Sequence, residues 1–186
     1  MSELCKLWVN NREIEADGDR KLIDVLRNDL RLKSVKDGCS EGACGTCTVV
    51  IDGKATKTCV QKVSRMAGKH VLTVEGLSQR EKDVFVYAFG EAAPSSAASA
   101  SPAWSCAARP HRRNPAPSRL EIAAAIRNNI CRCTGYKKII DAIAMAADLL
   151  RTGQAIPVRG GYRGVGDPCQ RINVKAKVLG IGKYTD

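Results

Sequence analysis

The most informative stretch of the chain reads Cys39-Ser40-Glu41-Gly42-Ala43-Cys44-Gly45-Thr46-Cys47, and Cys59 follows it after eleven further residues. Three cysteines in one loop at C-x4-C-x2-C spacing, with a fourth from a separate segment, form the ligand pattern of a plant-type 2Fe–2S cluster. Two irons need four thiolates, two on each iron. We therefore predict that a 2Fe–2S cluster is bound by Cys39, Cys44, Cys47 and Cys59.

Three glycines, Gly38, Gly42 and Gly45, lie in and beside this loop. A loop that wraps closely around a cluster needs residues without bulk and with unusual backbone angles, and glycine meets both needs. Backbone N–H groups there can also point at the sulfurs and tune the reduction potential. A structural zinc site is the alternative for four cysteines, although zinc sites usually use two short C-x2–4-C pairs.

The residues around the loop, 1–77, have the pattern of a small mixed α+β domain. We expect Trp8 to lie in its core, and Asp52-Gly53 is a strong turn pair. Turn residues and apolar periodicity predict a hairpin over 4–15, with Asn10-Asn11 at its turn, and a helix over 21–30. Two further strands are predicted over 47–51 and 70–74.

Residues 78–152 read as a helical domain. Helices are expected over 83–89, with Phe85 in the core, over 120–129 after a capping box of Ser118 and Glu121, and over 136–150. The pair Cys131 and Cys133 lies at the junction of the last two helices and could supply half of a second cluster. Residues 78–130 contain no C-x2-C pair to complete it, and their one cysteine is Cys106.

The net charge of +11 is distributed unevenly. Residues 92–117 carry +3 and residues 151–186 carry +5, so most of the excess lies outside the segments that look folded. A nucleic-acid-binding protein usually gathers its positive charge on a folded face, so we expect no nucleic-acid partner. No apolar stretch is long enough to span a bilayer, so we expect no membrane partner. Nine cysteines without a signal-peptide pattern indicate the cytoplasm.

Two motifs, GCSEGACGTCTVVIDG at 38–53 and NNICRCTGYKKIIDAI at 128–143, resemble the iron–sulfur subunits or domains of the molybdenum hydroxylases. This group contains xanthine dehydrogenase, aldehyde oxidase and carbon monoxide dehydrogenase, and the resemblance covers about residues 3–91 and 114–150. It implies a β-grasp ferredoxin-like domain followed by an all-α, four-helix type domain, each with one 2Fe–2S cluster. Cys131 and Cys133 would then be half of the second ligand set.

The same resemblance implies an electron-transfer module of an oxidoreductase. Electrons would pass from a molybdopterin centre through the clusters to FAD or another acceptor. The implied partners are a molybdopterin-binding catalytic subunit or domain and a FAD-binding subunit. The chain shows no nucleophile–base pair, Walker loop or dinucleotide fingerprint, so we predict no catalytic residues and no substrate chemistry on this chain alone.

The chain departs from the family within 92–117, where Ala, Ser and Pro fill nineteen of 26 positions. Family members carry a G-A-x-Q-C-G-F-C-x-P-G-M segment there, which would supply the two missing cysteines. In a reading frame one base earlier, each codon takes the third base of one residue and the first two bases of the next. The codons of Ser96 to Ala100 can encode that C-G-F-C segment in this frame. Our hypothesis is that about 93–113 is an out-of-frame reading, and the alternative is a flexible linker. As written, the chain lacks two ligands of the second cluster.

The last part of the chain, 153–186, resembles a linker and the start of the family's molybdopterin-binding part, through the VGDP, NVKAKVLG and YTD segments. An unstructured basic tail is the alternative. Two other functions stay open for the whole chain. One is a free-standing 2Fe–2S ferredoxin-like carrier, and the other is a zinc-stabilised binding module without a redox role.

Overall fold

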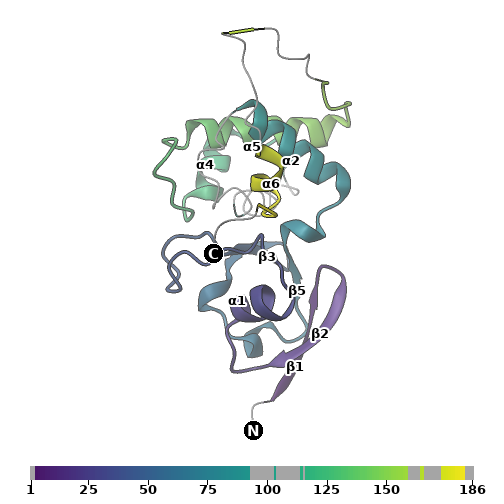
Figure 1. Ribbon diagram of the computed structural model, residues 1–186, viewed down its shortest axis with the longest axis vertical. Helices are drawn as coiled ribbons and strands as arrows, with labels where there is room; N and C mark the ends of the chain where they lie inside the picture. Colours follow the sequence, from purple (N-terminus) through teal and green to yellow (C-terminus); the bar gives the residue numbers. More distant parts are fainter. Residues whose placement is uncertain are drawn as a thin grey trace.

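The chain folds into a sheet-containing half and a helical half, stacked along the long axis of the molecule (Figure 1). The computed structural model describes residues 3–92, 103, 114, 116–158, 164–165 and 173–182. Most of the Ala/Ser/Pro segment and most of the tail lie outside these residues. The hypotheses of a frame shift at 93–113 and of a molybdopterin-binding start after 153 therefore stay predictions.

A five-stranded mixed sheet forms the N-terminal half, in the order β2-β1-β5-β3-β4. Strands β1 and β5 run parallel, and the other neighbouring pairs are antiparallel. The predicted hairpin is present, and Asn10 and Asn11 at its turn have positive φ values of 50° and 66°. The strands are β1 Leu4–Val9, β2 Arg12–Asp17, β3 Thr48–Ile51, β4 Lys54–Lys57 and β5 His70–Leu72.

The predicted helix over 21–30 is present as α1 Leu22–Asp24, which continues into a π-helix, η1 Val25–Asp29. The N–H of Leu30 bonds to the Val25 carbonyl five residues back, at 3.0 Å. The buried side chains of Leu22 and Leu26 belong to the same hydrophobic core as Leu7 and Val49 of the sheet. Three short 3-10 helices connect the rest of this half, η2 Thr58–Val60, η3 Val63–Met66 and η4 Val74–Gly76.

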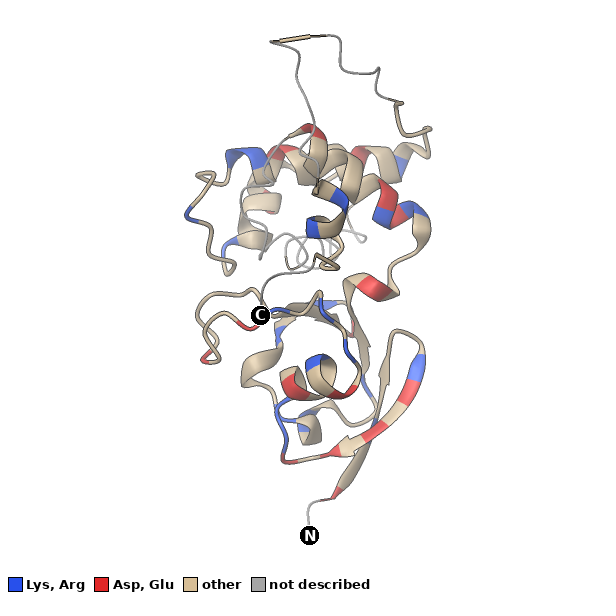
Figure 2. Cartoon of the chain, viewed as in Figure 1, with Lys and Arg blue, Asp and Glu red and all other residues tan. Residues whose placement is uncertain are grey.

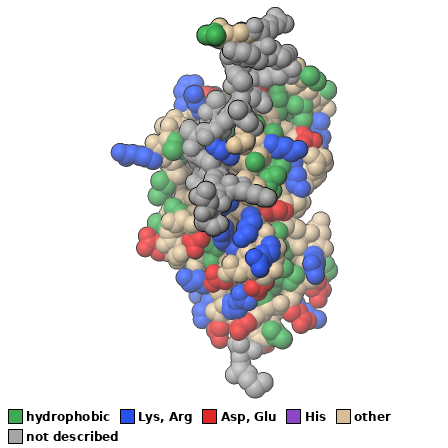
Figure 3. Space-filling model, viewed as in Figure 1, with side chains coloured by type: hydrophobic (Ala, Val, Ile, Leu, Met, Phe, Trp, Pro, Cys, Tyr) green, Lys and Arg blue, Asp and Glu red, His purple; other side chains and the backbone are tan. Residues whose placement is uncertain are grey.

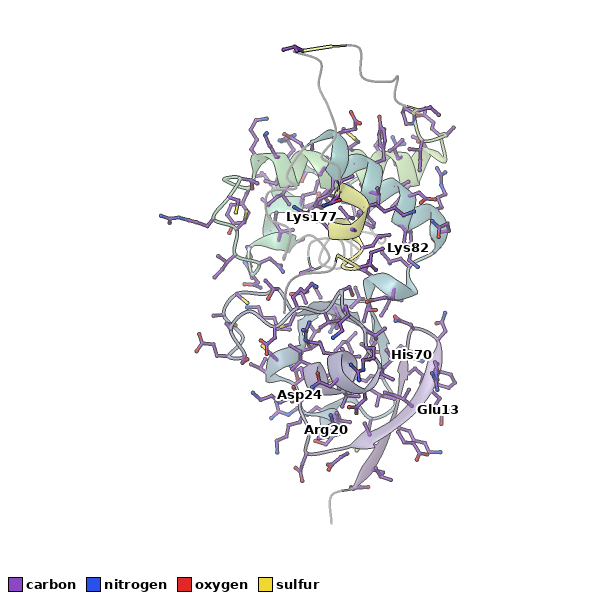
Figure 4. All side chains as sticks on the ribbon, in the orientation of Figure 1. Glu13, Arg20, Asp24, His70, Lys82 and Lys177 are labelled. Carbon is purple, nitrogen blue, oxygen red and sulfur yellow. The ribbon has the colours of Figure 1, made fainter. Side chains whose placement is uncertain are left out.

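The helical half contains α2 Gln79–Glu91, α4 Arg119–Ile126, α5 Lys137–Thr152 and the short α6 Val174–Val178. The α+β fold class is confirmed, and so is the capping box of Ser118 and Glu121 at the start of α4. Helix α2 is longer than expected because Ser78 and Glu81 form a second capping box at its start. Lys82 donates to the Glu75 carbonyl at 2.8 Å and so ties α2 to η4 (Figure 4).

Strand β3 joins the two hydrophobic cores. All four of its residues are buried. Val49 and Ile51 belong to the core of the sheet half, whereas Val50 belongs to the core of the helical half with Phe89 and Ile139. Alternate side chains of one strand therefore serve two cores, because successive residues of a strand point to opposite faces.

Three expectations about single elements need correction. Trp8 is 36% exposed and stacks on His70 with ring centroids 5.8 Å apart, because it lies on the outward face of β1 (Figure 4 labels His70). Phe85 is buried as expected. Strand β4 was not anticipated after the Asp52-Gly53 turn. The tail shows no clear helical period, yet it contains α6, whose Val174 and Val178 are buried in the helical core.

Charged side chains of both signs are distributed along the sheet half (Figure 2). On the face shown in Figure 3, basic and acidic groups alternate over this half. Exposed pairs such as Lys6 with Glu15, at 3.2 Å, contribute little stability. Among the described residues, no helix is both long and apolar enough to span a membrane.

Candidate iron–sulfur site

The four cysteines of the first motif lie together and form two pairs. Cys39 is hydrogen-bonded with Cys44, and Cys59 with Cys47. Cys39 and Cys44 lie on the half-exposed part of the loop, whereas Cys47 and Cys59 are buried. Cys47 directly precedes β3, and Cys59 lies in η2 after β4. The β3–β4 hairpin thus brings the fourth thiol back to the loop.

Backbone N–H groups of the loop point at the sulfurs. The N–H of Cys44 donates to Cys39 Sγ at 3.4 Å, and the N–H groups of Glu41 and Ala43 also donate to it. These bonds, led by that of Cys44, hold the pKa of Cys39 down at about 7. Burial raises the pKa of Cys59 to about 12, and its bond to Cys47 acts in the same direction. The loop is therefore built to stabilise negative charge on Cys39.

The three predicted glycines lie where a side chain would collide with the loop or its neighbours. A Cβ on Gly38 would lie 2.8 Å from Thr46 Oγ1 and 3.1 Å from Cys44 Sγ. Gly42 and Gly45 have φ values of +83° and +76°, in the left-handed region that favours glycine. A Cβ on Gly45 would lie 2.3 Å from the backbone oxygen of Asn128. These positions fit a loop folded tightly around a group held by its sulfurs.

Four thiols arranged as two pairs suit two irons better than a single metal ion. A tetrahedral zinc site needs its ligands around one point. A 2Fe–2S cluster needs two thiolates on each of two irons, which is the pairing that the thiol–thiol hydrogen bonds describe. The donor set and the loop therefore fit a 2Fe–2S cluster.

The second cysteine pair lies at the junction of α4 and α5, as the sequence predicts. Cys131 is half-buried and Cys133 is exposed. The N–H of Cys131 donates to Tyr136 Oη at 2.9 Å, and Tyr136 Oη donates to the Asn129 carbonyl at 3.2 Å. Tyr136 has a positive φ of 66° as the residue before α5. The ring of Tyr136 thus braces the turn that carries Cys131.

The two cysteine motifs are joined by direct hydrogen bonds. Ile130 donates its N–H to the Cys44 carbonyl at 2.9 Å. Asn129, whose exposure is 2%, donates its side-chain amide to the Gly45 carbonyl at 2.7 Å and to Thr48 Oγ1 at 3.1 Å. The junction of α4 and α5 therefore sits directly on the cysteine loop.

Two contributors to the site were not recognised from the sequence. Asn129 belongs to the quoted motif, but its spacing to Gly45 gives no hint of contact. Lys57 extends from β4 to the loop, where its Nζ donates to the Gly42 carbonyl at 2.6 Å and to the Ala43 carbonyl at 3.4 Å. The signal for Lys57 would have been the register of β3 with β4, which pairs Lys57 with Thr48.

Two protein-family models match the chain. A 2Fe-2S iron-sulfur cluster binding domain matches residues 6–86, and a 2Fe-2S binding domain matches residues 73–144. The small FeS subunit of nicotinate dehydrogenase from Eubacterium barkeri is 36% identical over 139 residues, which are 74% of this chain and 88% of that subunit. The nicotine 6-hydroxylase small subunit of Paenarthrobacter nicotinovorans is 33% identical, over 71% of this chain and 81% of that subunit.

Solved structures agree in fold. The aldehyde oxidoreductase of Desulfovibrio desulfuricans superposes with a TM-score of 0.88 at 33% identity, over 98% of this chain and 21% of that chain. Quinoline 2-oxidoreductase from Pseudomonas putida 86 gives a TM-score of 0.71 at 32% identity, over 83% of this chain and 99% of its matched chain. The similarity thus includes short separate subunits and the corresponding part of a much longer chain.

Proposed function

The chain belongs to the 2Fe–2S small subunits and domains of the molybdenum hydroxylase family, and from this premise we propose that its cysteine loop holds a 2Fe–2S cluster on an electron route from a molybdopterin centre to FAD or another acceptor. These small subunits and domains are the iron–sulfur electron-transfer modules of oxidoreductases. When bound, such a cluster supplies a one-electron acceptor and donor, whose potential depends on hydrogen bonds and burial. Substrate chemistry would take place on a partner.

The observation that carries this proposal is the pairing of four thiols, with backbone N–H groups directed at Cys39 and Cys59. We assign Cys39 and Cys44 to one iron, and Cys47 and Cys59 to the other. The backbone N–H groups of Glu41, Ala43 and Cys44 would then stabilise the charge on Cys39. Gly38, Gly42 and Gly45 would keep the loop close to the bound group.

We assign Cys131 and Cys133 to half of a second site. Their turn contacts the first loop through Ile130 and Cys44 at 2.9 Å, so electrons exchanged between the two sites would cross few bonds. As the sequence is written, two ligands are missing, since the C-G-F-C segment expected in this family does not occur in it. The second site would therefore fail to hold its cluster, or would hold it weakly.

We further propose a molybdopterin-binding catalytic partner and a FAD-binding subunit. Small separate subunits in nicotinate dehydrogenase and nicotine 6-hydroxylase support a multi-subunit arrangement. The match to aldehyde oxidoreductase over 98% of this chain supports residues 153–186 as a linker and the beginning of a molybdopterin-binding part. Packing of α6 on α2 and in the helical core is consistent with a tail that returns to the body of the molecule.

Metal and sulfide analysis of the purified, anaerobically handled chain tests the proposal. We expect about two irons and two acid-labile sulfides per chain, and one electron paramagnetic resonance signal after reduction with dithionite. Cys47→Ser and Cys59→Ser should abolish the signal. Cys5→Ser should keep it, because Cys5 lies apart from the loop with its Sγ 3.8 Å from the Glu3 carbonyl. An iron-free chain that contains zinc would refute the proposal.

Co-purification separates the proposed subunit from a free-standing carrier. Tagged chain expressed in its native host should retain a molybdopterin-binding protein. A chain with a normal 2Fe–2S signal that retains no such protein, even under mild low-salt conditions, would instead support the free-standing carrier.

A further inference from the structure

Lys57 contacts the cysteine loop from a strand that contributes no ligand to it. It is half-buried at the end of β4, opposite Thr48 in the register of the hairpin. Its Nζ lies 2.6 Å from the Gly42 carbonyl oxygen and 3.4 Å from the Ala43 carbonyl oxygen. An ammonium group therefore rests on two successive peptide groups of the loop.

The same two peptide groups donate to Cys39 from their other ends. The Gly42 carbonyl shares its peptide group with the N–H of Ala43, which donates to Cys39. The Ala43 carbonyl shares its peptide group with the N–H of Cys44, which lies 3.4 Å from Cys39 Sγ. A peptide group polarised at its oxygen becomes a stronger donor at its N–H, because successive hydrogen bonds polarise one another.

We propose that Lys57 is a positioning residue that raises the reduction potential of the first cysteine site, by polarising the peptide groups that donate to Cys39 and by placing a positive charge beside the loop. The inference rests on the proposed 2Fe–2S function of that loop. Taking up one electron adds one negative charge near the sulfurs, and stronger N–H donors together with a nearby cation favour the reduced state. A lysine that only held the conformation of the loop would leave the ratio of reduced to oxidised sites unchanged.

Potentiometric titration of the iron-loaded chain, with dithionite as the one-electron donor and electron paramagnetic resonance as the readout, tests the inference. Lys57→Met should lower the ratio of reduced to oxidised sites roughly tenfold at a fixed potential, which is about 59 mV for a one-electron couple. Lys57→Arg should keep most of the wild-type potential, because a guanidinium retains the charge and the donors. Lys54→Gln is the matched control, since it removes one exposed positive charge from the other end of the same strand.

A shift in Lys57→Met no larger than that in Lys54→Gln would overturn the inference. An equal shift in Lys57→Arg would also overturn it. If Lys57→Met does not retain iron, Lys57→Gln takes its place, because its amide can still donate but carries no charge. A wild-type potential in Lys57→Gln would refute the role, and so would loss of iron from both neutral variants. The wild-type signal tests the proposed function itself, so the two failures are distinguishable.

Discussion

The backbone N–H of Ile130 donates to the carbonyl of Cys44 at 2.9 Å, across 86 positions of sequence. This bond places the turn that carries Cys131 directly on the loop that carries Cys44. The neighbouring residue, Asn129, adds two side-chain hydrogen bonds to the same region. One contact between the two halves therefore lies at the cysteine sites themselves, and substitutions there should affect both stability and iron binding.

Asn129→Ala should destabilise the chain by about 2 kcal/mol, because it removes two buried hydrogen bonds at roughly 1 kcal/mol each. The Gly45 carbonyl would keep its bonds from Thr48, so no carbonyl is left unpaired. Asn128→Ala is the matched control, since the side chain of Asn128 is exposed. Urea unfolding of both variants measures the difference. Equal midpoints for the two variants would contradict the role assigned to Asn129.

Gly45→Ala should cost at least about 3 kcal/mol and lower the iron content, because a positive φ and a steric clash act together. Its Cβ would lie 2.3 Å from the Asn128 carbonyl oxygen. Gly53→Ala has a similar φ of +80° but no atom within 4 Å of the added Cβ, so it should cost only about 1 kcal/mol. Thermal unfolding and iron per chain provide the comparison. Similar losses for the two variants would show that the close approach at Gly45 does not matter.

Tyr136→Phe should destabilise the turn before α5 by about 1–2 kcal/mol, because the hydroxyl both accepts from Cys131 and donates to Asn129. Hydrogen exchange should show faster exchange at the Cys131 amide. Tyr87→Phe on α2 serves as the control and should leave that amide unchanged. Unaltered protection of Cys131 in Tyr136→Phe would rule out the bracing role.

Asp141→Asn should reduce stability by less than about 1 kcal/mol at pH 7, because its partners Arg119 and Lys137 are well exposed. Hydrogen bonds from Arg119 and Lys137 lower the pKa of Asp141 in the folded chain. The stabilisation is therefore present above the unfolded pKa of about 4 and is lost as the pH falls through the lower folded value. Urea unfolding at pH 7 and pH 3 should show a smaller difference from wild type at pH 3 than at pH 7. The same difference at both values would exclude the ion pair as its cause.

Local patterns in the sequence predicted the elements well wherever one short segment determines the structure. The turn at Asn10-Asn11 and the capping box of Ser118 and Glu121 depend on neighbouring residues alone, and both were confirmed. The same spacing occurs in Ser78 and Glu81, and their capping box starts α2 at Gln79, four residues before the predicted helix over 83–89. The π-helical end of the first helix was not predicted, because apolar spacing alone does not distinguish a π-helical turn from an α-helical one.

The cysteine spacing, the loop glycines and the motif at 128–143 were sufficient to identify the fold class and the family, because these features depend on short segments of chain. Only the tertiary structure revealed that Val50 serves the second core, that Asn129 rests on Gly45, and that Lys57 reaches the carbonyls of the loop. Contacts between distant segments depend on how strands pair and helices pack. Such contacts have no periodicity and no fixed spacing in the sequence, so the sequence alone does not reveal them.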